Sequence, residues 1–277
     1  RLAASLMAAL LLAATAVAAA SAMAPTLGTA VVTGGSRGIG AACSMRLAAM
    51  GFGVVIAYRS DEAAAAAVCE AIRATGGLAH ACRADVSVES DVLALFTFAD
   101  TCFDGAPLRA LVNNAGILGP SGVDLAAAGG VEALAQIMAI NVGGPMLCCR
   151  EAERRMSTAQ GGSGGSIVQI SSGSANIGTP LLYAASKGAL NSMTVGLVRP
   201  FGQAGIRINT VSPGMTHTDM VDHLASSFDM SQVPLGRMGA PAEVANAVAW
   251  LCSDEASYVA GANLRVSGGR PPGTLIG

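Results

Sequence analysis

A glycine-rich turn near the start of the chain is the feature that most constrains how it can fold. The turn runs from Thr33 to Gly40, follows the apolar run 29–32 and precedes the helix-compatible segment 41–47. Glycines let a backbone turn sharply and lie close to a bound group, and a helix that begins there points unpaired N–H groups at that group. A strand, a glycine turn and a helix in this order predict a dinucleotide-phosphate site. The spacing G-x-x-x-G-x-G differs from the commoner G-x-G-x-x-G, so the turn alone is also compatible with purely steric glycines.

Strand-like and helix-like segments alternate from residue 29 to residue 266. Strands are expected at 29–33, 53–58, 78–82, 109–112, 166–170, 206–211 and 263–266, with helical stretches such as 62–75 and 88–103 between them. This alternation predicts a single-domain α/β fold, a Rossmann-like doubly wound parallel sheet of seven strands with helices on both faces. Asp85, Val86 and Ser87 directly precede the helix at 88–103, and we expect them to cap it.

Composition excludes several classes of function. The 277 residues are 52% hydrophobic and 12% charged with a net charge of −2, which is enough apolar content for one large core. Because no run of basic residues occurs, neither a nucleic-acid groove nor an anionic-membrane patch is expected. The seven cysteines are scattered without metal-ligand spacing, so we expect no metal site, buried thiols and a reducing compartment.

The two ends of the chain are interpreted apart from the fold. Residues 1–24 contain an apolar stretch, 6–20, and small residues typical of a cleavage site, which indicate a leader or an untranslated upstream segment. That stretch is too short and alanine-rich for a membrane span. Translation from Met23 would favour the cytoplasm, whereas a genuine leader would direct the chain to an organelle such as a plastid or to secretion. The catalytic domain is expected at 25–270 and a tail at 271–277.

A tyrosine and a lysine stand four residues apart in the second half of the chain. Tyr183 and Lys187 lie in the helix-compatible segment 183–198, so they project from one face. A phenol needs a nearby cation to act as an acid or base near neutral pH, and Lys187 is placed to supply one. An isolated pair of this kind is also compatible with an ordinary surface helix.

The motifs TGGSRGIG, NNAG at 113–116, a serine pair ending the strand at 166–170, YAASK at 183–187 and PG at 213–214 occur here in one order. In these motifs the chain resembles the short-chain dehydrogenase/reductases, among them 3-oxoacyl-acyl-carrier-protein reductases and glucose-dehydrogenase-like members. The likeness covers about residues 29–269. The resemblance implies Tyr183 as the general acid, Ser172 as the group that holds the carbonyl oxygen, and Lys187 as the cation that lowers the pKa of the tyrosine. It assigns Asn141 the support of a water beside Lys187, although this asparagine could simply bond to a neighbouring backbone.

The choice of serine rests on the family habit of using the second member of the pair. Ser171 alternates to the opposite strand face, so only one of the two can point at a ketone. Ser174 lies in the same loop, which has ten residues between Ser172 and Tyr183, slightly fewer than is usual in the ketoacyl reductases. Residues 220–234 are expected to form a lid over the substrate.

The resemblance and the glycine turn together imply the residues that bind the cofactor. They are Gly34, Ser36, Arg37, Gly38, Ile39, Gly40, Arg59, Asp85, Val86, Asn113, Ala115, Gly116, Tyr183, Lys187, Pro213, Gly214, Thr216 and Thr218. No carboxylate ends the strand at 53–58, and Arg59 follows it at once. An arginine there accommodates a 2′-phosphate, so NADPH is expected rather than NADH.

The resulting hypothesis is an NADPH-dependent reductase that converts a ketone, first of all a 3-oxoacyl thioester, to a secondary alcohol. Sugars, polyols or xenobiotic ketones are the alternative substrates, and a non-catalytic nucleotide-binding regulator is a further alternative. An acidic acyl carrier protein would need basic residues at the mouth of the site, for which Arg154, Arg155 and Arg207 are candidates. The family implies a homotetramer or dimer, although Pro200 is expected to break or kink the helix that packs the subunits together.

Overall fold

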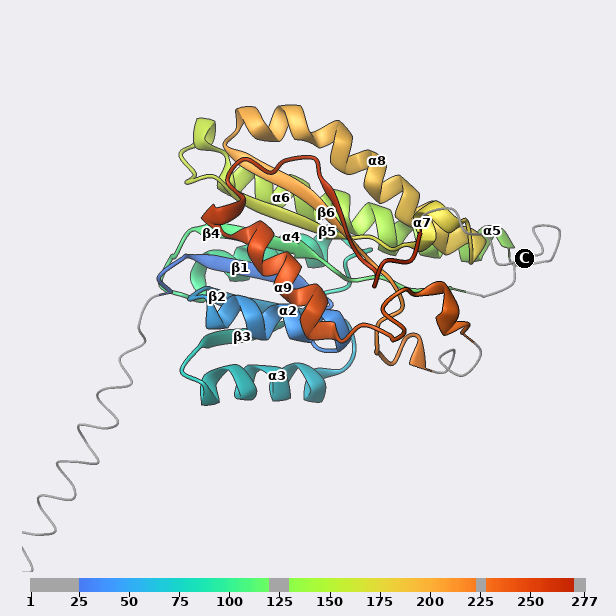
Figure 1. Cartoon of the computed structure of the whole chain (residues 1–277). Helices are drawn as coiled ribbons and strands as arrows, with labels where there is room; N and C mark the ends of the chain where they lie inside the picture. Colours follow the sequence, from blue (N-terminus) through green and yellow to red (C-terminus); the bar gives the residue numbers. More distant parts are fainter. Residues whose placement is uncertain (1–24, 120–129, 223–227, 272–277) are drawn as a thin grey trace, which may run out of the picture.

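The fold is a single parallel sheet covered by helices on both faces (Figure 1). It is seen in a computed structural model, which describes residues 25–119, 130–222 and 228–271. The strands are β1 (Thr29–Thr33), β2 (Gly53–Tyr58), β3 (Leu78–Arg83), β4 (Leu108–Asn113), β5 (Gly165–Ile170), β6 (Ile206–Pro213) and β7 (Asn263–Val266). The helices are α2 (Gly38–Ala49), α3 (Glu62–Ala74), α4 (Glu89–Thr101), α5 (Gly130–Met138), α6 (Gly144–Met156), α7 (Ser174–Ile177), α8 (Leu181–Gln203) and α9 (Pro241–Cys252), with short helical turns η1 (Ala139–Gly143), η2 (Thr158–Gln160), η4 (Met230–Gln232) and η5 (Asp254–Ala256).

The strands lie in the order β3-β2-β1-β4-β5-β6-β7, and every neighbouring pair is parallel. The central strands are almost entirely buried, since sequences such as TAVVT and GVVIAY carry β-branched side chains to both faces. The chain reverses its direction of winding between β1 and β4. In open parallel sheets, ligands bind at such a switch point, beyond the carboxyl ends of the strands. The predicted seven-stranded, doubly wound sheet is therefore confirmed.

Each face of the sheet has its own apolar core. On one face, α2, α3 and α9 pack around Leu47, Ile56 and Val248. On the other, α4, α6 and α8 pack around Phe96, Leu111 and Ile208 (Figure 1). Burial of this much apolar surface on both sides holds the carboxyl ends of the strands rigidly in place.

Two local predictions were wrong. Asp85 does not cap α4, because its carboxylate accepts hydrogen bonds from the N–H and hydroxyl of Ser87, at 2.9 and 2.6 Å, in the turn before the helix. Val88 occupies the cap position instead and has no side-chain acceptor to offer. Of the expected break or kink at Pro200, the break does not occur, because α8 continues to Gln203. Proline lacks the N–H that would donate one helical hydrogen bond. Because Pro200 lies only three residues from the end of the helix, only the last turn is affected.

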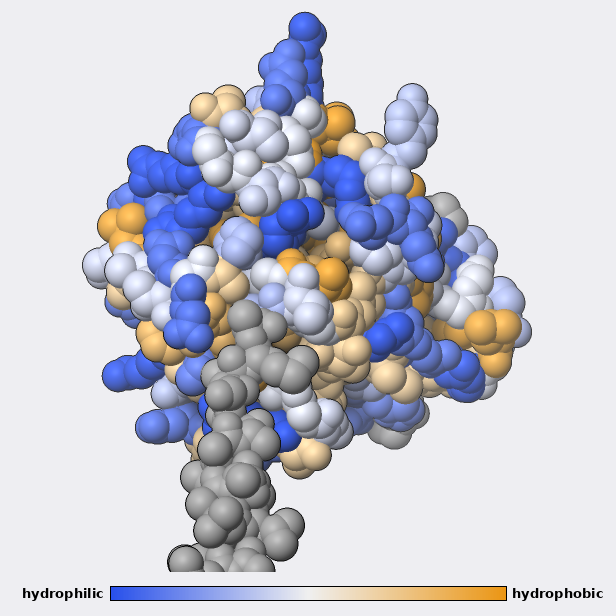
Figure 2. Space-filling model, turned by 90° about the vertical axis from the view of Figure 1, so that its left-hand side faces the viewer, coloured by the Kyte–Doolittle hydropathy of each residue, from blue (hydrophilic) through white to orange (hydrophobic). Residues whose placement is uncertain are grey.

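The run from Gly130 to Met156, which joins α5, η1 and α6, is the one helical stretch among the described residues that is long and apolar enough to cross a membrane. It meets this criterion by length and composition only. In the structure it packs against β4, α4 and α8. The expected leader (1–24) lies outside the described residues, as do parts of the expected lid (223–227) and of the tail (272–277). Figure 2 views the side on which the strands begin, where hydrophilic side chains predominate around the rim and more apolar residues gather toward the centre.

Candidate active site

The glycine turn links β1 to α2 and is shaped by close approaches. Gly34 and Gly38 have φ values of +61° and +52°, which side chains rarely adopt. A Cβ on Gly40 would lie 2.1 Å from the carbonyl oxygen of Gly34, so the first turn of the helix packs directly on the loop. No side chain caps the start of α2, and no acidic residue lies in its first turn. Its free N–H groups and positive dipole end are therefore available to an anion.

A cavity of about 510 Å³ opens beside this turn, at the switch point. Of the residues predicted to bind a cofactor, it is lined by Gly34, Ser36, Arg37, Gly38, Ile39, Arg59, Asp85, Val86, Ala115, Gly116 and Thr218. No carboxylate ends β2, where it would repel a phosphate. The strand ends at Tyr58, and Arg59 is the first residue of the loop. Asp61 also lines the cavity, but its carboxylate accepts the N–H of Ala64 as the cap of α3. We call this space the nucleotide cavity.

Two predicted cofactor residues lie outside the lining of this cavity and of the one beside it. Gly40 faces Gly34, as described above. The amide of Asn113 points into the core, where it donates to the carbonyl of Pro145 at 3.4 Å and to the Sγ of Cys149 at 3.6 Å. Its neighbour Asn114 lines both cavities and donates to the carbonyls of Thr33 and Gly34, each at 3.0 Å. Strand alternation places Asn113 in the core and leaves Asn114 to tie the glycine turn to β4.

A second cavity, of about 260 Å³, adjoins the first. Ser172, Tyr183 and Lys187 all line it, with Pro213, Gly214, Thr216 and Thr218 from the loop after β6. We call it the catalytic cavity. The second serine of the pair is the one that faces it with its hydroxyl: Ser172 is hydrogen-bonded to Tyr183, whereas Ser171 donates to the carbonyl of Lys187 at 3.1 Å. The two hydroxyls therefore have different partners, and of the two it is the Ser172 hydroxyl that lies at Tyr183; its role in catalysis stays a prediction.

Burial governs the proton affinities of the tyrosine and the lysine. It raises the pKa of Tyr183, and the hydrogen bond with Ser172 lowers it only in part. It also lowers the pKa of Lys187 to about 8, although the ammonium donates to the carbonyl of Ile170 at 2.8 Å. The Lys187 Nζ lies 5.5 Å from the centre of the Tyr183 ring. The lowering of the tyrosine pKa by the lysine that the resemblance implied is thus not seen, because burial has the larger effect.

Asn141 lies in η1, a π-helical turn between α5 and α6. Its oxygen accepts the N–H of Ile117, and its amide donates to the carbonyl of the same residue, both at 2.9 Å, and to the hydroxyl of Ser186 at 3.0 Å. Ser186 in turn donates to the carbonyl of Tyr183 at 2.7 Å. Both amide hydrogens therefore bond to protein groups. This agrees with the alternative that Asn141 bonds to a neighbouring backbone rather than supporting a water. Asn141 fixes the segment after β4 to the helix that carries the catalytic pair, and π-helical turns are frequent at functional sites.

The sequence analysis missed three residues in and after β7. Arg265 in β7 and Ser267 and Arg270 after it line the catalytic cavity, although residue 270 was expected only as the last residue of the domain, before the tail at 271–277. The motif at 213–214 offered a signal, because β7 pairs with β6 and brings Val266 beside Pro213. His217, by contrast, lies in an exposed contact with Asp222 at 3.3 Å and lines neither cavity.

Known proteins resemble this chain along most of its length. A family model described as enoyl-(acyl carrier protein) reductase matches residues 34–270. An uncharacterized oxidoreductase, YgfF, of Escherichia coli is 42% identical over 87% of this chain and 99% of its own. The 3beta-hydroxysteroid dehydrogenase 1 of Eggerthella lenta is 39% identical over 87% of this chain and 92% of its own. The chain belongs to the short-chain dehydrogenase/reductase family. A solved member from Burkholderia cenocepacia, in complex with NADP, shares 34% identity and a TM-score of 0.81 over 90% of this chain and 99% of its own.

In this member of the short-chain dehydrogenase/reductase family, the residues present fit a nicotinamide dinucleotide. A turn with positive φ at Gly34 and Gly38 lines the cavity, the helix start is uncapped, and the cavity lies at the switch point; such a cofactor requires all three features. The nucleotide cavity would hold the adenosine end and the phosphates. The catalytic cavity would then receive the reactive end of the cofactor next to Tyr183.

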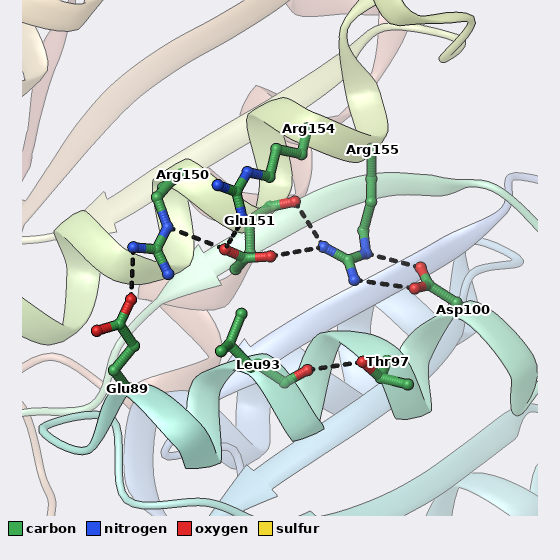
Figure 3. A network of polar contacts seen from close by, with 8 residues as sticks. All are labelled: Glu89, Leu93, Thr97, Asp100, Arg150, Glu151, Arg154 and Arg155. Atoms are coloured by element: carbon green, nitrogen blue, oxygen red, sulfur yellow. Dashed lines mark hydrogen bonds and ion pairs between the residues drawn. The ribbon is translucent and has the colours of Figure 1, made fainter.

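The basic residues expected to receive a carrier protein are not at the mouth of the catalytic cavity. Arg155 forms a two-pronged ion pair with Asp100 of α4, and Arg154 pairs with the buried Glu151 at 2.9 Å (Figure 3). Both lie at the end of α6 that meets the start of β5, opposite the cavities. Arg207 lies at the start of β6 and donates to the carbonyls of Ser253 and Val259. The prediction that these three arginines form a docking patch at the site was therefore wrong.

Proposed function

We propose that the protein is an NADPH-dependent reductase that converts a ketone to a secondary alcohol. The observation that carries the proposal is the cluster of Ser172, Tyr183 and Lys187 in a cavity that adjoins the nucleotide cavity. A nicotinamide cofactor supplies the hydride when it is bound. The hydroxyl of Ser172 would hold the carbonyl oxygen of the substrate, and Tyr183 would give that oxygen a proton as negative charge develops on it. Lys187, whose Nζ lies 5.5 Å from the centre of the phenol ring, would favour the phenolate that remains.

The preference for NADPH rests on the charges around the nucleotide cavity. Arg37 and Arg59 both line it. Arg37 lies 3.8 Å from Asp219, and both side chains of that pair are largely exposed, so the ion pair leaves the guanidinium accessible. Arg59 lies near Asp85, whose pKa is lowered by the hydrogen bonds from Ser87 and by the charge of Arg59, even though burial alone would raise it. A guanidinium at the end of β2 is the feature that accommodates a 2′-phosphate.

Among ketones, a 3-oxoacyl thioester is the first to test, because the matching family model describes a reductase of acyl-carrier substrates. Docking of an acyl carrier protein is not part of the proposal, since its expected basic residues are engaged elsewhere. A homotetramer or dimer stays a prediction; apolar side chains on α6 and α8, such as Met146 and Val195, are exposed and would be covered in an oligomer.

The experiment follows the oxidation of NADPH and of NADH by the full chain with acetoacetyl thioester as substrate. We expect turnover with NADPH, and we expect Tyr183→Phe to lose at least 100-fold in kcat while it still binds NADPH, because only the transferable proton is gone. Arg59→Ala should raise KM for NADPH roughly tenfold and leave KM for NADH unchanged, since it removes one charged contact to the 2′-phosphate. Arg46→Ala, an exposed arginine of α2 bonded to Asn246, is the matched control. Full activity of Tyr183→Phe would refute the catalytic assignment, and equal loss for both cofactors would refute the role of Arg59.

A further inference from the structure

Two arginines line the catalytic cavity together with Ser172 and Tyr183. Arg265 lies in β7, and Arg270 follows the turn after it. No acidic side chain is among the described residues that line this cavity, and Lys187 adds a third basic group. The cavity is therefore strongly biased toward positive charge.

The fold places both arginines with specific backbone features. Leu264 and Val266 pack toward the core formed by α2 and α9, so strand alternation turns Arg265 to the other face, on which α8 lies. After β7, Gly268 and Gly269 have φ values of +61° and +86°, and the N–H of Arg270 bonds to the carbonyl of Ser267 at 3.2 Å. Two consecutive residues with positive φ make a tight reversal that favours glycine at both positions. This reversal returns Arg270 to the cavity.

The contacts of the two guanidinium groups leave their charges without a counterion. Arg265 donates to the carbonyl of Arg270, and Arg270 donates to the side-chain oxygen of Gln232 at 2.9 Å and lies 5.1 Å from the ring centre of Phe228. Neither forms an ion pair within the described parts of the chain, and the Nε atoms of both are buried without a hydrogen-bond partner there. Burial and the charge of Arg265 both lower the pKa of Arg270. Two partly buried like charges, each with a buried Nε that has no acceptor, favour an anion beside them.

We propose that the ketone substrate carries a carboxylate, which binds to Arg265 and Arg270 while its carbonyl oxygen lies at Ser172 and Tyr183. The protein is then a reductase of small oxo acids, a reading that rests on the proposed reductase function. The planar guanidinium matches a carboxylate with two parallel hydrogen bonds, and a cavity of about 260 Å³ suits a short substrate. The phosphates of the cofactor are not the anion in question, because neither arginine lines the nucleotide cavity.

The test compares three oxo acids with their methyl esters, which keep the ketone and remove the charge. The acids are 3-oxobutanoate, 4-oxopentanoate and 5-oxohexanoate, since the distance between ketone and carboxylate selects one of them. We expect kcat/KM for the best acid to exceed that for its ester at least tenfold. Arg265→Gln and Arg270→Gln should each lower kcat/KM for that acid roughly 10- to 100-fold, mainly through KM, and leave the ester unchanged. Arg270→Lys should recover part of the loss, and Arg46→Gln should change nothing.

Two measurements separate this proposal from its alternatives. Affinity for NADPH, followed by the fluorescence of the reduced nicotinamide, should be the same in all variants; a loss in the arginine variants would assign the pair to the cofactor. Calorimetric titration with the corresponding acids that lack the ketone, and with their methyl esters, measures carboxylate binding without turnover. If no ketone is reduced but the acids bind and the Gln variants abolish binding, the proposed function fails and the anion site stands. If acids and esters behave alike in the wild type, or if the Gln variants lose both equally, the arginines only anchor the residues around Phe228 and Gln232, and the inference is overturned.

Discussion

Replacement of Lys187 by methionine should make the protein more stable at neutral pH while it abolishes turnover. The side chain is only 3% exposed, and its ammonium has a single hydrogen-bond acceptor among the described residues, the carbonyl of Ile170 at 2.8 Å. Methionine has a similar length and volume, so Lys187→Met removes the charge with little change in packing. A catalytic group of this kind is kept at the expense of stability.

The magnitude follows from the proton affinity of the buried amine. A decrease in pKa from 10.5 to about 8 corresponds to about 3 kcal/mol of folding free energy lost below pH 8. The variant also loses the hydrogen bond to Ile170, which costs about 1–2 kcal/mol and offsets part of this gain. The variant should therefore be about 1–2 kcal/mol more stable than the wild type at pH 7, a rise in Tm of about 5 °C for a chain of this size.

Urea denaturation of both proteins at pH 7, 8, 9 and 10 measures the effect. In this range the unfolded lysine keeps its proton and the folded lysine releases it near pH 8, so the unfolded state binds more protons and wild-type stability rises with pH. The variant lacks this rise, and the stability difference should shrink to near zero or reverse by pH 10. Parallel pH profiles for the two proteins would refute the lowered pKa. A variant less stable than the wild type at pH 7 would show that the hydrogen bond outweighs the cost of the buried charge.

Three further substitutions, one of them a control, test the glycine turn and the arginine network. Gly40→Ala should lower the unfolding free energy by about 1–3 kcal/mol and weaken NADPH binding, because the new Cβ would lie 2.1 Å from the carbonyl of Gly34. Gly202→Ala, in α8 with open space around it, should instead raise the unfolding free energy by about 0.5–1 kcal/mol; equal effects would show that the loop can adapt. Glu151→Gln should cost about 2 kcal/mol at pH 7, because three arginines of α6 lose a carboxylate that is 3% exposed. Burial alone would raise the pKa of Glu151, yet the arginines hold it below 4.5. The unfolding free energy of the wild type should therefore fall by the same amount as the pH drops below that value and the carboxylate is protonated. The Gln variant, which has no carboxylate at this position, should not show this loss.

The sequence predicted the parts of this protein that depend on local pattern. Apolar runs and glycine turns located all seven strands within two residues of their ends, because buried parallel strands must be continuously apolar. Alternation along β5 and beyond it also predicted that only one of Ser171 and Ser172 faces the site, although the choice of Ser172 came from the family resemblance. These features require no knowledge of what lies across the fold.

The errors arose where tertiary contacts decide between two local possibilities. Asp85 has the chemistry of a helix cap, but the hydroxyl of Ser87 captures its carboxylate first. The pair at 113–114 offers two asparagines, and only the sheet register assigns Asn113 to the core. Arg270 lies beyond the last family motif, so its return to the cavity depends on the turn before it and on the pairing of β7 with β6. Arg154 and Arg155 were expected to be free charges although Glu151 lies three and four residues before them on the same helix, a pairing the sequence could have indicated; only Asp100, the other partner of Arg155, is identified by the packing of α4 on α6.

The π-helical turn at 139–143 also sets the phase between two halves of one long helical run. An α-helix advances about 100° and 1.5 Å per residue, so removal of the one extra residue would rotate everything from Gly130 to Met138 by that angle against α6. Asn141 would then no longer face Ile117 and Ser186. An insertion or deletion within this short stretch would therefore separate the segment after β4 from the helix that carries Tyr183, even if every other residue were kept.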